Sequence, residues 1–335
     1  MSSPHPTTPV ADIIPRPAAV TRWERMRNRR VGWLVECIAE AMGTFLYTFA
    51  GAGATAAFVL GNILKISGLG SLLQVGIAYA VGIALALTVC VAISEGHFNP
   101  GFTIHAVVMR GFPIGKALRL IVAQIFGSYI ACLLVYVQYK QLIHAAIDVL
   151  KANGTYESVM FTPNGPGGIF GFYVTEGANL GYVVLNEFVC DFILGICIFG
   201  VLEPSNHFAT PTTMPWLIAL AYGVVVWGFA PVGVAANAAR DLGGRFAALT
   251  LFGREASGGN YAAIAALTNI PAILLAGLVH DFVFMDSSRA INPEWHQLVA
   301  STEANAVRRA GGEPPSPSSG SVRSDGGEKK LEMSA

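Results

Sequence analysis

Six long apolar stretches constrain this chain more than any other feature of its sequence. Each is close to the roughly 20 residues that a helix needs to cross the hydrocarbon core of a bilayer. Because lipid offers the backbone no hydrogen-bond partners, segments of this length are expected to be helical. The sequence therefore predicts an all-α membrane protein with spans near residues 33–58, 72–93, 116–138, 181–202, 214–233 and 261–284.

Composition supports this class and argues against others. Hydrophobic residues make up 53% of the 335 residues and charged residues only 13%, against roughly 25% charged residues in an ordinary soluble domain. The 21 Lys and Arg balance the 21 Asp and Glu, so no nucleic-acid partner is expected. The five Cys lie within apolar segments without a CxxC pair. Neither a disulfide framework, a metal site nor a cofactor is therefore indicated.

The two ends of the chain are polar. Residues 1–32 end in a run of arginines, and residues 285–335 are rich in Ser, Pro and Gly, so both tails are predicted to be disordered. Their Lys and Arg predict that both termini are cytosolic, and we expect the plasma membrane. The connection 139–180 would then be extracytoplasmic, where the sequon Asn153-Gly154-Thr155 is either glycosylated or a chance match.

The apolar region looks like two copies of one unit, about 33–138 and about 181–284. Glu40 in the first span has a counterpart in Glu187 of the fourth. Three spans per copy is an odd number, so the second copy must be inverted, which places a functional site near the bilayer midplane. We favour a structural role for both carboxylates, accepting hydrogen bonds from backbone N–H groups of buried loops. A proton relay is the alternative.

Each copy also contains a short, helix-prone run that begins with Asn. The first is His97-Phe98-Asn99-Pro100-Gly101-Phe102-Thr103, and the second is Asn237-Ala238-Ala239-Arg240-Asp241-Leu242-Gly243. Asn is a strong N-cap, and Pro suits the first helical position. Two such caps meeting inside the membrane would present two amide donors, and the positive ends of two helix dipoles would face the same spot. Neutral solutes would tolerate such a site better than cations.

Arg240 is a further candidate for lining the path. An arginine on a buried half-helix is costly unless it faces a wet cavity, where it would offer several donors and a fixed charge. The alternative is an ion pair with Asp241, which we disfavour because adjacent helical residues point in different directions.

At these residues the chain resembles the major intrinsic protein family, the aquaporins and aquaglyceroporins, over about residues 33–284. The resemblance rests on the two Asn-led runs, the paired Glu40 and Glu187, and Gln124-x-x-Gly127 in the third span. It implies six transmembrane helices and two re-entrant half-helices forming a passive channel for small uncharged solutes, assembled as a homotetramer. It also implies supporting roles for His97 and Gln124.

The chain departs from the usual Asn-Pro-Ala motif of this family at Gly101 and Ala238. Glycine should loosen the first half-helix, since it costs up to about 1 kcal/mol relative to alanine. The family's spacing implies a selectivity filter made of Tyr79, Val225, Val234 and Arg240. An apolar wall opposite a donor suits glycerol better than water alone, although a water-selective pore and ordinary packing of Tyr79 and Val225 remain alternatives.

No enzyme chemistry is visible in the sequence. Two other classes of function stay open beside a channel that conducts water and glycerol. One is a proton-coupled transporter acting through Glu40 or Glu187. The other is a non-conducting membrane scaffold, which the altered motifs make conceivable.

Overall fold

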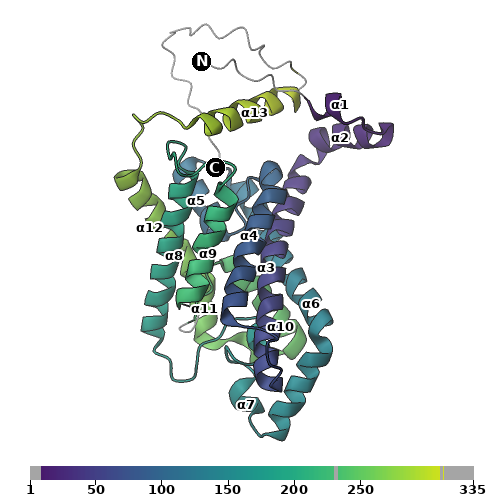
Figure 1. Ribbon diagram of the computed structural model, residues 1–335, viewed down its shortest axis with the longest axis vertical. Coiled ribbons are helices and arrows are strands. Elements are labelled where there is room, and N and C mark those ends of the chain that lie inside the picture. Colours follow the sequence, from purple (N-terminus) through teal and green to yellow (C-terminus); the bar gives the residue numbers. More distant parts are fainter. Residues whose placement is uncertain (1–8, 230–232, 310–311, 313–335) are drawn as a thin grey trace.

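The computed structural model describes residues 9–229, 233–309 and 312, and within these residues the chain forms helices and no strands. A bundle of long helices carries several short ones between and beside them (Figure 1). The long and medium helices are α3 (Gly32–Leu64), α4 (Leu72–Ser94), α5 (Pro100–Arg110), α6 (Ile114–Ala152), α8 (Leu180–Leu202), α9 (Met214–Phe229), α10 (Ala238–Phe252), α11 (Gly259–Leu267), α12 (Asn269–Val279) and α13 (Pro293–Arg309). The remaining helices are α1 (Val10–Ile13), α2 (Ala18–Arg30), α7 (Tyr156–Val159), η1 (Pro166–Ile169), η3 (Arg254–Ser257) and η4 (His280–Phe284).

All six expected spans correspond to apolar helical segments. Five are long enough to cross a membrane, and the sixth, α9, is a shorter apolar helix that ends at Phe229; the predicted span continued through 230–232, which lie outside the described residues. Helix α6 is longer than predicted and continues to Ala152. The first part of the predicted 139–180 connection is therefore helical.

The last span is interrupted near its middle. Helix α11 ends at Leu267, and α12 begins at Asn269 after a turn at Thr268. Pro271 lacks the N–H that would bond to the carbonyl of Leu267, four residues earlier, which accounts for a break at this point. The span then ends in the π-helical turn η4.

The helix pairing shows the inverted repeat. In the first half α3 packs against α4 and α6, and in the second half α8 packs against α9 and α12. The half-helix of each repeat packs against the last span of the other, α5 against α12 and α10 against α6. Helices α4 and α9, which correspond to each other, are in direct contact. Six spans and two half-helices thus form the predicted aquaporin-like fold.

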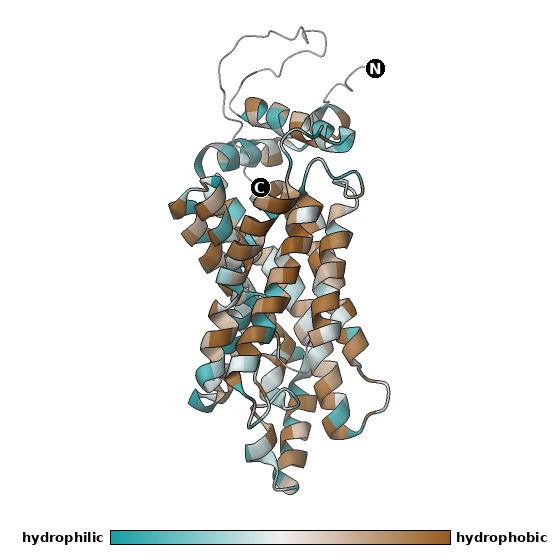
Figure 2. Ribbon diagram, turned by 90° about the vertical axis from the view of Figure 1, so that its left-hand side faces the viewer, coloured by the Kyte–Doolittle hydropathy of each residue, from teal (hydrophilic) through white to brown (hydrophobic). Residues whose placement is uncertain are grey.

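Apolar residues predominate along the long helices of the bundle, and hydrophilic residues are more frequent in the helices at its upper end (Figure 2). Small residues allow the helices to approach closely, as is usual in membranes. A Cβ atom at Gly127 would lie 2.0 Å from the carbonyl oxygen of Ala41. Only glycine therefore permits this contact between α6 and α3.

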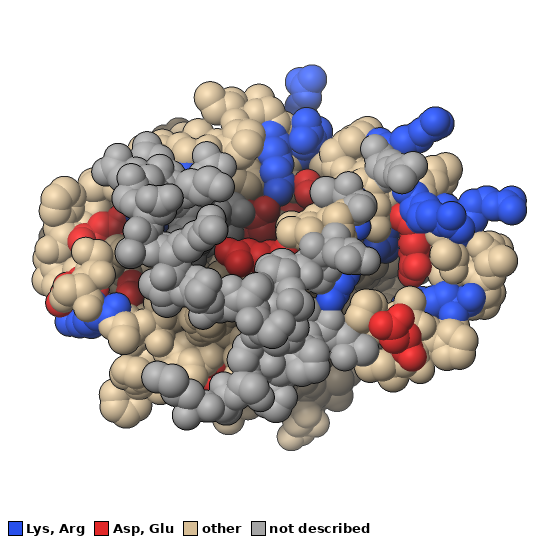
Figure 3. All heavy atoms as spheres, turned by 90° about the horizontal axis from the view of Figure 1, so that it is seen from above, with Lys and Arg blue, Asp and Glu red and all other residues tan. Residues whose placement is uncertain are grey.

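The described parts of both tails contain helices, whereas residues 1–8, 310–311 and 313–335 of the predicted disordered tails lie outside the described residues. Helices α1 and α2 lie within 1–32, and α13 lies within 285–335; α2 and α13 are found at the same end of the bundle (Figure 1). Local capping and packing explain α13: the side chain of Asn292 accepts a hydrogen bond from Glu294 N at 3.0 Å, and Trp295 Nε1 donates to the carbonyl of Ala209 at 3.1 Å. Figure 3 shows Lys and Arg side chains gathered at this end, with acidic residues among them.

Candidate functional site

The two half-helices begin at the predicted asparagines. The side chain of Asn99 accepts a hydrogen bond from Gly101 N at 2.9 Å, and Pro100 occupies the first turn of α5. The side chain of Asn237 accepts from Ala239 N at 2.9 Å and from Arg240 N at 3.2 Å at the start of α10. Each Asn oxygen is thus held by its own helix, so the amide nitrogen faces away from that helix.

Each amide reaches across to the other motif. Asn99 Nδ2 donates to the carbonyl of Ala236 at 3.1 Å, and Asn237 Nδ2 donates to the carbonyl of Phe98 at 2.8 Å. These two carbonyls precede the two asparagines, and both residues have positive φ, +49° at Phe98 and +55° at Ala236. A positive φ is uncommon outside glycine and is maintained here by surrounding contacts. Because a side-chain amide carries two hydrogens, each Asn keeps one for another acceptor.

Glu40 fixes the loop that leads into the first motif. Its Oε1 accepts from His97 N at 3.0 Å and from Ser94 Oγ at 2.9 Å. Its Oε2 accepts from Phe98 N at 2.8 Å and from Gln124 Nε2 at 2.7 Å. The backbone partners are those expected of a structural carboxylate. Gln124 also donates to Thr103 Oγ1 at 3.1 Å, and the His97 ring lies 3.2 Å from the same hydroxyl.

Glu187 acts in the same way on the second motif. Its two oxygens lie 2.8 and 3.0 Å from Ala235 N. The hydroxyl of Tyr261 donates to Oε1 at 2.9 Å. With all these donors directed at it, the carboxylate holds a loop in place, and its geometry favours the structural role over a proton relay.

Arg240 is fully buried beside the second motif. Its Nε donates to the hydroxyl of Tyr79 at 3.1 Å, and its Nη1 and Nη2 donate to the carbonyls of Phe170 and Ile169 at 2.5 and 3.4 Å. The guanidinium also lies 3.9 Å from the ring centroid of Phe172. The connection between α6 and α8 thus anchors the arginine.

Asp241 does not pair with Arg240. Its carboxylate lies 3.7 Å from Arg245 Nη2, one helical turn further on. Arg245 also donates to the carbonyls of Phe172 and Ala256. The alternative ion pair with Arg240 is therefore not formed, and the charge of Arg240 is left without a carboxylate partner among the described residues.

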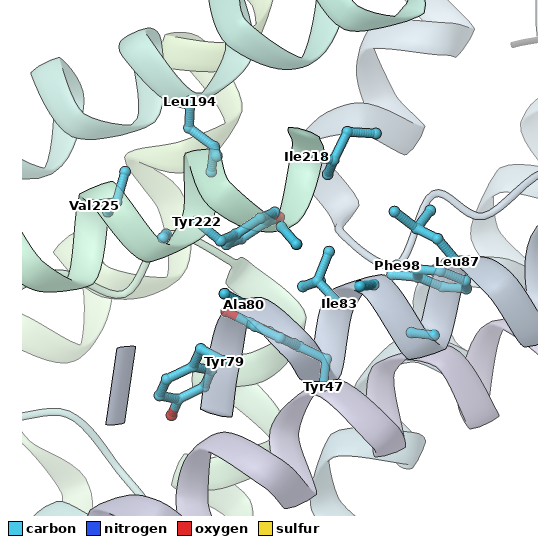
Figure 4. Close-up of a cluster of buried hydrophobic side chains, with 14 of the residues drawn as sticks. Tyr47, Tyr79, Ala80, Ile83, Leu87, Phe98, Leu194, Ile218, Tyr222 and Val225 are labelled. Carbon is cyan, nitrogen blue, oxygen red and sulfur yellow. The ribbon is translucent and has the colours of Figure 1, made fainter. Parts of the chain in front are cut away.

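The three remaining filter candidates share one buried cluster. Tyr79 is 4% exposed, Val225 1% and Val234 7%, and all three pack in the same group of apolar side chains. Figure 4 shows Tyr79 and Val225 from this cluster. The structure thus brings Tyr79 against Arg240 and places both valines in the same buried apolar cluster as Tyr79.

Sequence reasoning missed two tyrosines in this cluster. The ring of Tyr47 lies 5.2 Å from that of Tyr79 and 5.5 Å from that of Tyr222, between centroids (Figure 4). Tyr47 follows Glu40 by seven residues, two helical turns, on the same face of α3. That spacing was a signal that could have placed Tyr47 beside the motif. Phe172 had no such signal, because it lies in a long connection without periodicity.

The two departures from the usual motif are both buried. Ala238 begins α10 and is 2% exposed, and Ala239 follows it with no exposed surface. Gly101 lies in the first turn of α5. The half-helix α5 is complete to Arg110 despite this glycine.

The remaining predicted position lies away from this site. Asn153 caps the C-terminal end of α6 and is exposed. Across the described part of the chain, no group of three His, Cys, Asp or Glu side chains is arranged to hold a metal ion.

Comparisons with known proteins identify relatives of this chain. The family profile described as "Major intrinsic protein" matches residues 27–265. "Aquaporin-3" of Laccaria bicolor is 50% identical over 288 residues, covering 85% of this chain and 87% of that protein. "Glycerol uptake facilitator protein" of Haemophilus influenzae is 30% identical over 213 residues, covering 63% and 76%. The solved aquaglyceroporin from Plasmodium falciparum has the same fold, with a TM-score of 0.61 at 20% identity over 75% of this chain and 96% of that one.

Proposed function

Because the chain belongs to the major intrinsic protein family, we propose that it is a passive channel that conducts water and glycerol across a membrane. The observation that carries this proposal is the crossed pair of amides at Asn99 and Asn237. Each amide carries a second N–H that can bond to a passing oxygen at the point where two helix N-termini meet, and the Tyr222 side chain lies next to that of Asn99. Relatives named as an aquaporin and as a glycerol uptake facilitator support the same function and argue for a channel rather than an enzyme.

Selection against ions would follow from charge. The positive ends of two half-helices and the guanidinium of Arg240 raise the energy of a cation or proton in the path, as in aquaporin-type pores generally. A neutral molecule meets no such barrier, and its hydroxyl groups replace water as acceptors for the amides. The path would therefore conduct small uncharged solutes in both directions, down their gradients.

For the solute, we propose glycerol as well as water. Val225 and Val234 give an apolar wall for a carbon chain, and Arg240 offers donors to hydroxyl groups. The second candidate is a water-selective pore, which one observation favours: Tyr79 and Phe172 cover Arg240 so completely that none of it is exposed. Side chains packed this closely around the guanidinium leave less room for glycerol than for water.

Stopped-flow light scattering on proteoliposomes tests these proposals. Water and glycerol permeabilities well above those of empty liposomes are expected. A water permeability alone above that background would select the water-selective pore. Background values for both solutes would support the non-conducting scaffold. If Glu40→Gln kept this flux but abolished uphill uptake under a pH gradient, a proton-coupled transporter would replace the channel.

We further propose that residues 33–284 form the channel domain and that the protein acts as a homotetramer in the plasma membrane. Large apolar side chains exposed on the outer faces of the helices fit lipid or a second copy, among them Leu73, Ile77, Leu185 and Trp216. Helices α2 and α13 lie at one end of the bundle, and this end would be cytosolic by the positive-inside rule. Native mass spectrometry tests the oligomer, and protease protection in sealed vesicles tests the orientation.

A further inference from the structure

Asn269 lies behind the crossed amides and belongs to no motif. It is the first residue of α12, at the break in the last span, and its side chain is 1% exposed. Its Nδ2 donates to the carbonyl of Ala236 at 3.1 Å. This is the carbonyl that also accepts from Asn99 Nδ2 at 3.1 Å. Ala236 thus receives one amide from the first half-helix and one from the last span.

Gly101 leaves the space that Asn269 occupies. A Cβ atom at position 101 would lie 2.3 Å from Asn269 Oδ1 and 3.2 Å from Ile273 Cγ1. Separations under about 3 Å are not tolerated between such atoms, so alanine at position 101 would displace the Asn269 side chain. Because its Nδ2 is bonded to Ala236, that displacement would pull on the carbonyl that orients Asn99.

The second motif has no such arrangement. Its third residue, Ala239, keeps a Cβ atom and is fully buried. The carbonyl of Phe98 accepts from Asn237, and no other side-chain donor to it occurs within the described residues. Of the two motifs, only the first therefore combines a glycine at its third position with a neighbouring amide, that of Asn269, which donates to the facing carbonyl.

We propose that Asn269 is a positioning residue for the conduction path and that Gly101 is the complementary space that admits it. Asn269 holds the carbonyl of Ala236, whose left-handed backbone aims it at Asn99. Through Ala236 it fixes the direction in which Asn99 presents its remaining N–H. The proposal rests on the channel function above. It also gives Gly101, the altered third residue of the first motif, a structural partner in Asn269.

A double-mutant cycle in proteoliposomes tests the pair. Gly101→Ala alone is expected to lower water and solute permeability roughly tenfold, a change that corresponds to about 1.4 kcal/mol. Asn269→Ala alone is expected to lower it several-fold, because the carbonyl of Ala236 loses one of its two donors. The double variant is expected to recover to the level of Asn269→Ala alone, since the clash is removed while the Ala236 carbonyl still lacks the Asn269 donor. Gly53→Ala is the matched control, because a Cβ atom there meets nothing within 4 Å.

Two results would overturn the proposal: a harmless Gly101→Ala, or a double variant no better than the worse single variant. Thermal unfolding midpoints of the same four proteins in detergent give an independent readout that needs no transport. If the effects of the two substitutions on the unfolding midpoint are not additive but the parent protein conducts neither water nor glycerol, the channel function is overturned and the steric contact between Gly101 and Asn269 still holds. If the parent protein conducts but the effects of the two substitutions are additive, the channel function holds and the proposed coupling between Gly101 and Asn269 is overturned.

Discussion

Replacing Arg240 with alanine is the most informative perturbation of the path. The substitution removes the fixed charge and three hydrogen bonds, to Tyr79 and to the carbonyls of Phe170 and Ile169. Both carbonyls lose a buried donor, and each loss costs about 1–3 kcal/mol. The connection between α6 and α8 should loosen, and the protein should unfold at a lower temperature.

The effect of the charge on ion exclusion can be estimated. A cation about 4 Å from the guanidinium is repelled by about 1 kcal/mol in bulk water and about 4 kcal/mol at an effective dielectric constant of 20. A difference of roughly 1.4 kcal/mol changes the rate of passage tenfold. Arg240→Ala should therefore raise the cation leak by between about fivefold and several hundredfold. Water permeability should change much less, because water carries no net charge.

Liposomes loaded with a pH- or sodium-sensitive dye measure this leak alongside osmotic water flux. Arg240→Lys is the matched control, since it keeps the charge but not the planar fork of donors. It should retain ion exclusion while losing much of the thermal stability that Arg240→Ala loses. An unchanged cation leak in Arg240→Ala, with the protein folded and conducting water, would show that this side chain does not control the path.

Three further predictions concern the wall and the surface. Val225→His should reduce glycerol flux more than water flux, because it narrows the path; an equal loss of both would mean that position 225 does not line it. Tyr47→Leu should raise glycerol permeability about threefold, because it removes a ring packed between Tyr79 and Tyr222; unchanged flux would place Tyr47 outside the path. When the protein is made in a eukaryotic host, Asn153→Gln should remove one glycosidase-sensitive step in electrophoretic mobility, and an unaltered pattern would exclude the sequon.

Much of the fold could be predicted because the membrane leaves few choices. The lengths of the apolar stretches predicted the six spans. The repeated Glu and Asn positions indicated two inverted halves. The helix ends were less predictable: α6 continues to Ala152 because nothing in its sequence stops it at the membrane boundary. The break near Thr268 could have been anticipated from Pro271, which cannot donate within a helix.

The site, too, was predictable in some parts and not in others. Caps and structural carboxylates follow from local chemistry, so Asn99, Asn237, Glu40 and Glu187 could be assigned from the sequence. Contacts between segments far apart in sequence could not. The side chain of Asn269 and the carbonyl of Phe170 reach the site only through the packing of α12 and of the connection after α6.

The crossed amides also bear on the order in which the protein can be completed during synthesis. The carbonyl of Phe98 has its amide partner on a residue made 139 positions later. At about 5–20 residues per second, the ribosome needs on the order of 10 seconds to reach that residue. Until then, the carbonyl of Phe98 lacks this amide partner, so the first half is a folding intermediate that only the second half completes. A nascent chain stalled between the halves should therefore be a preferred target for membrane quality control.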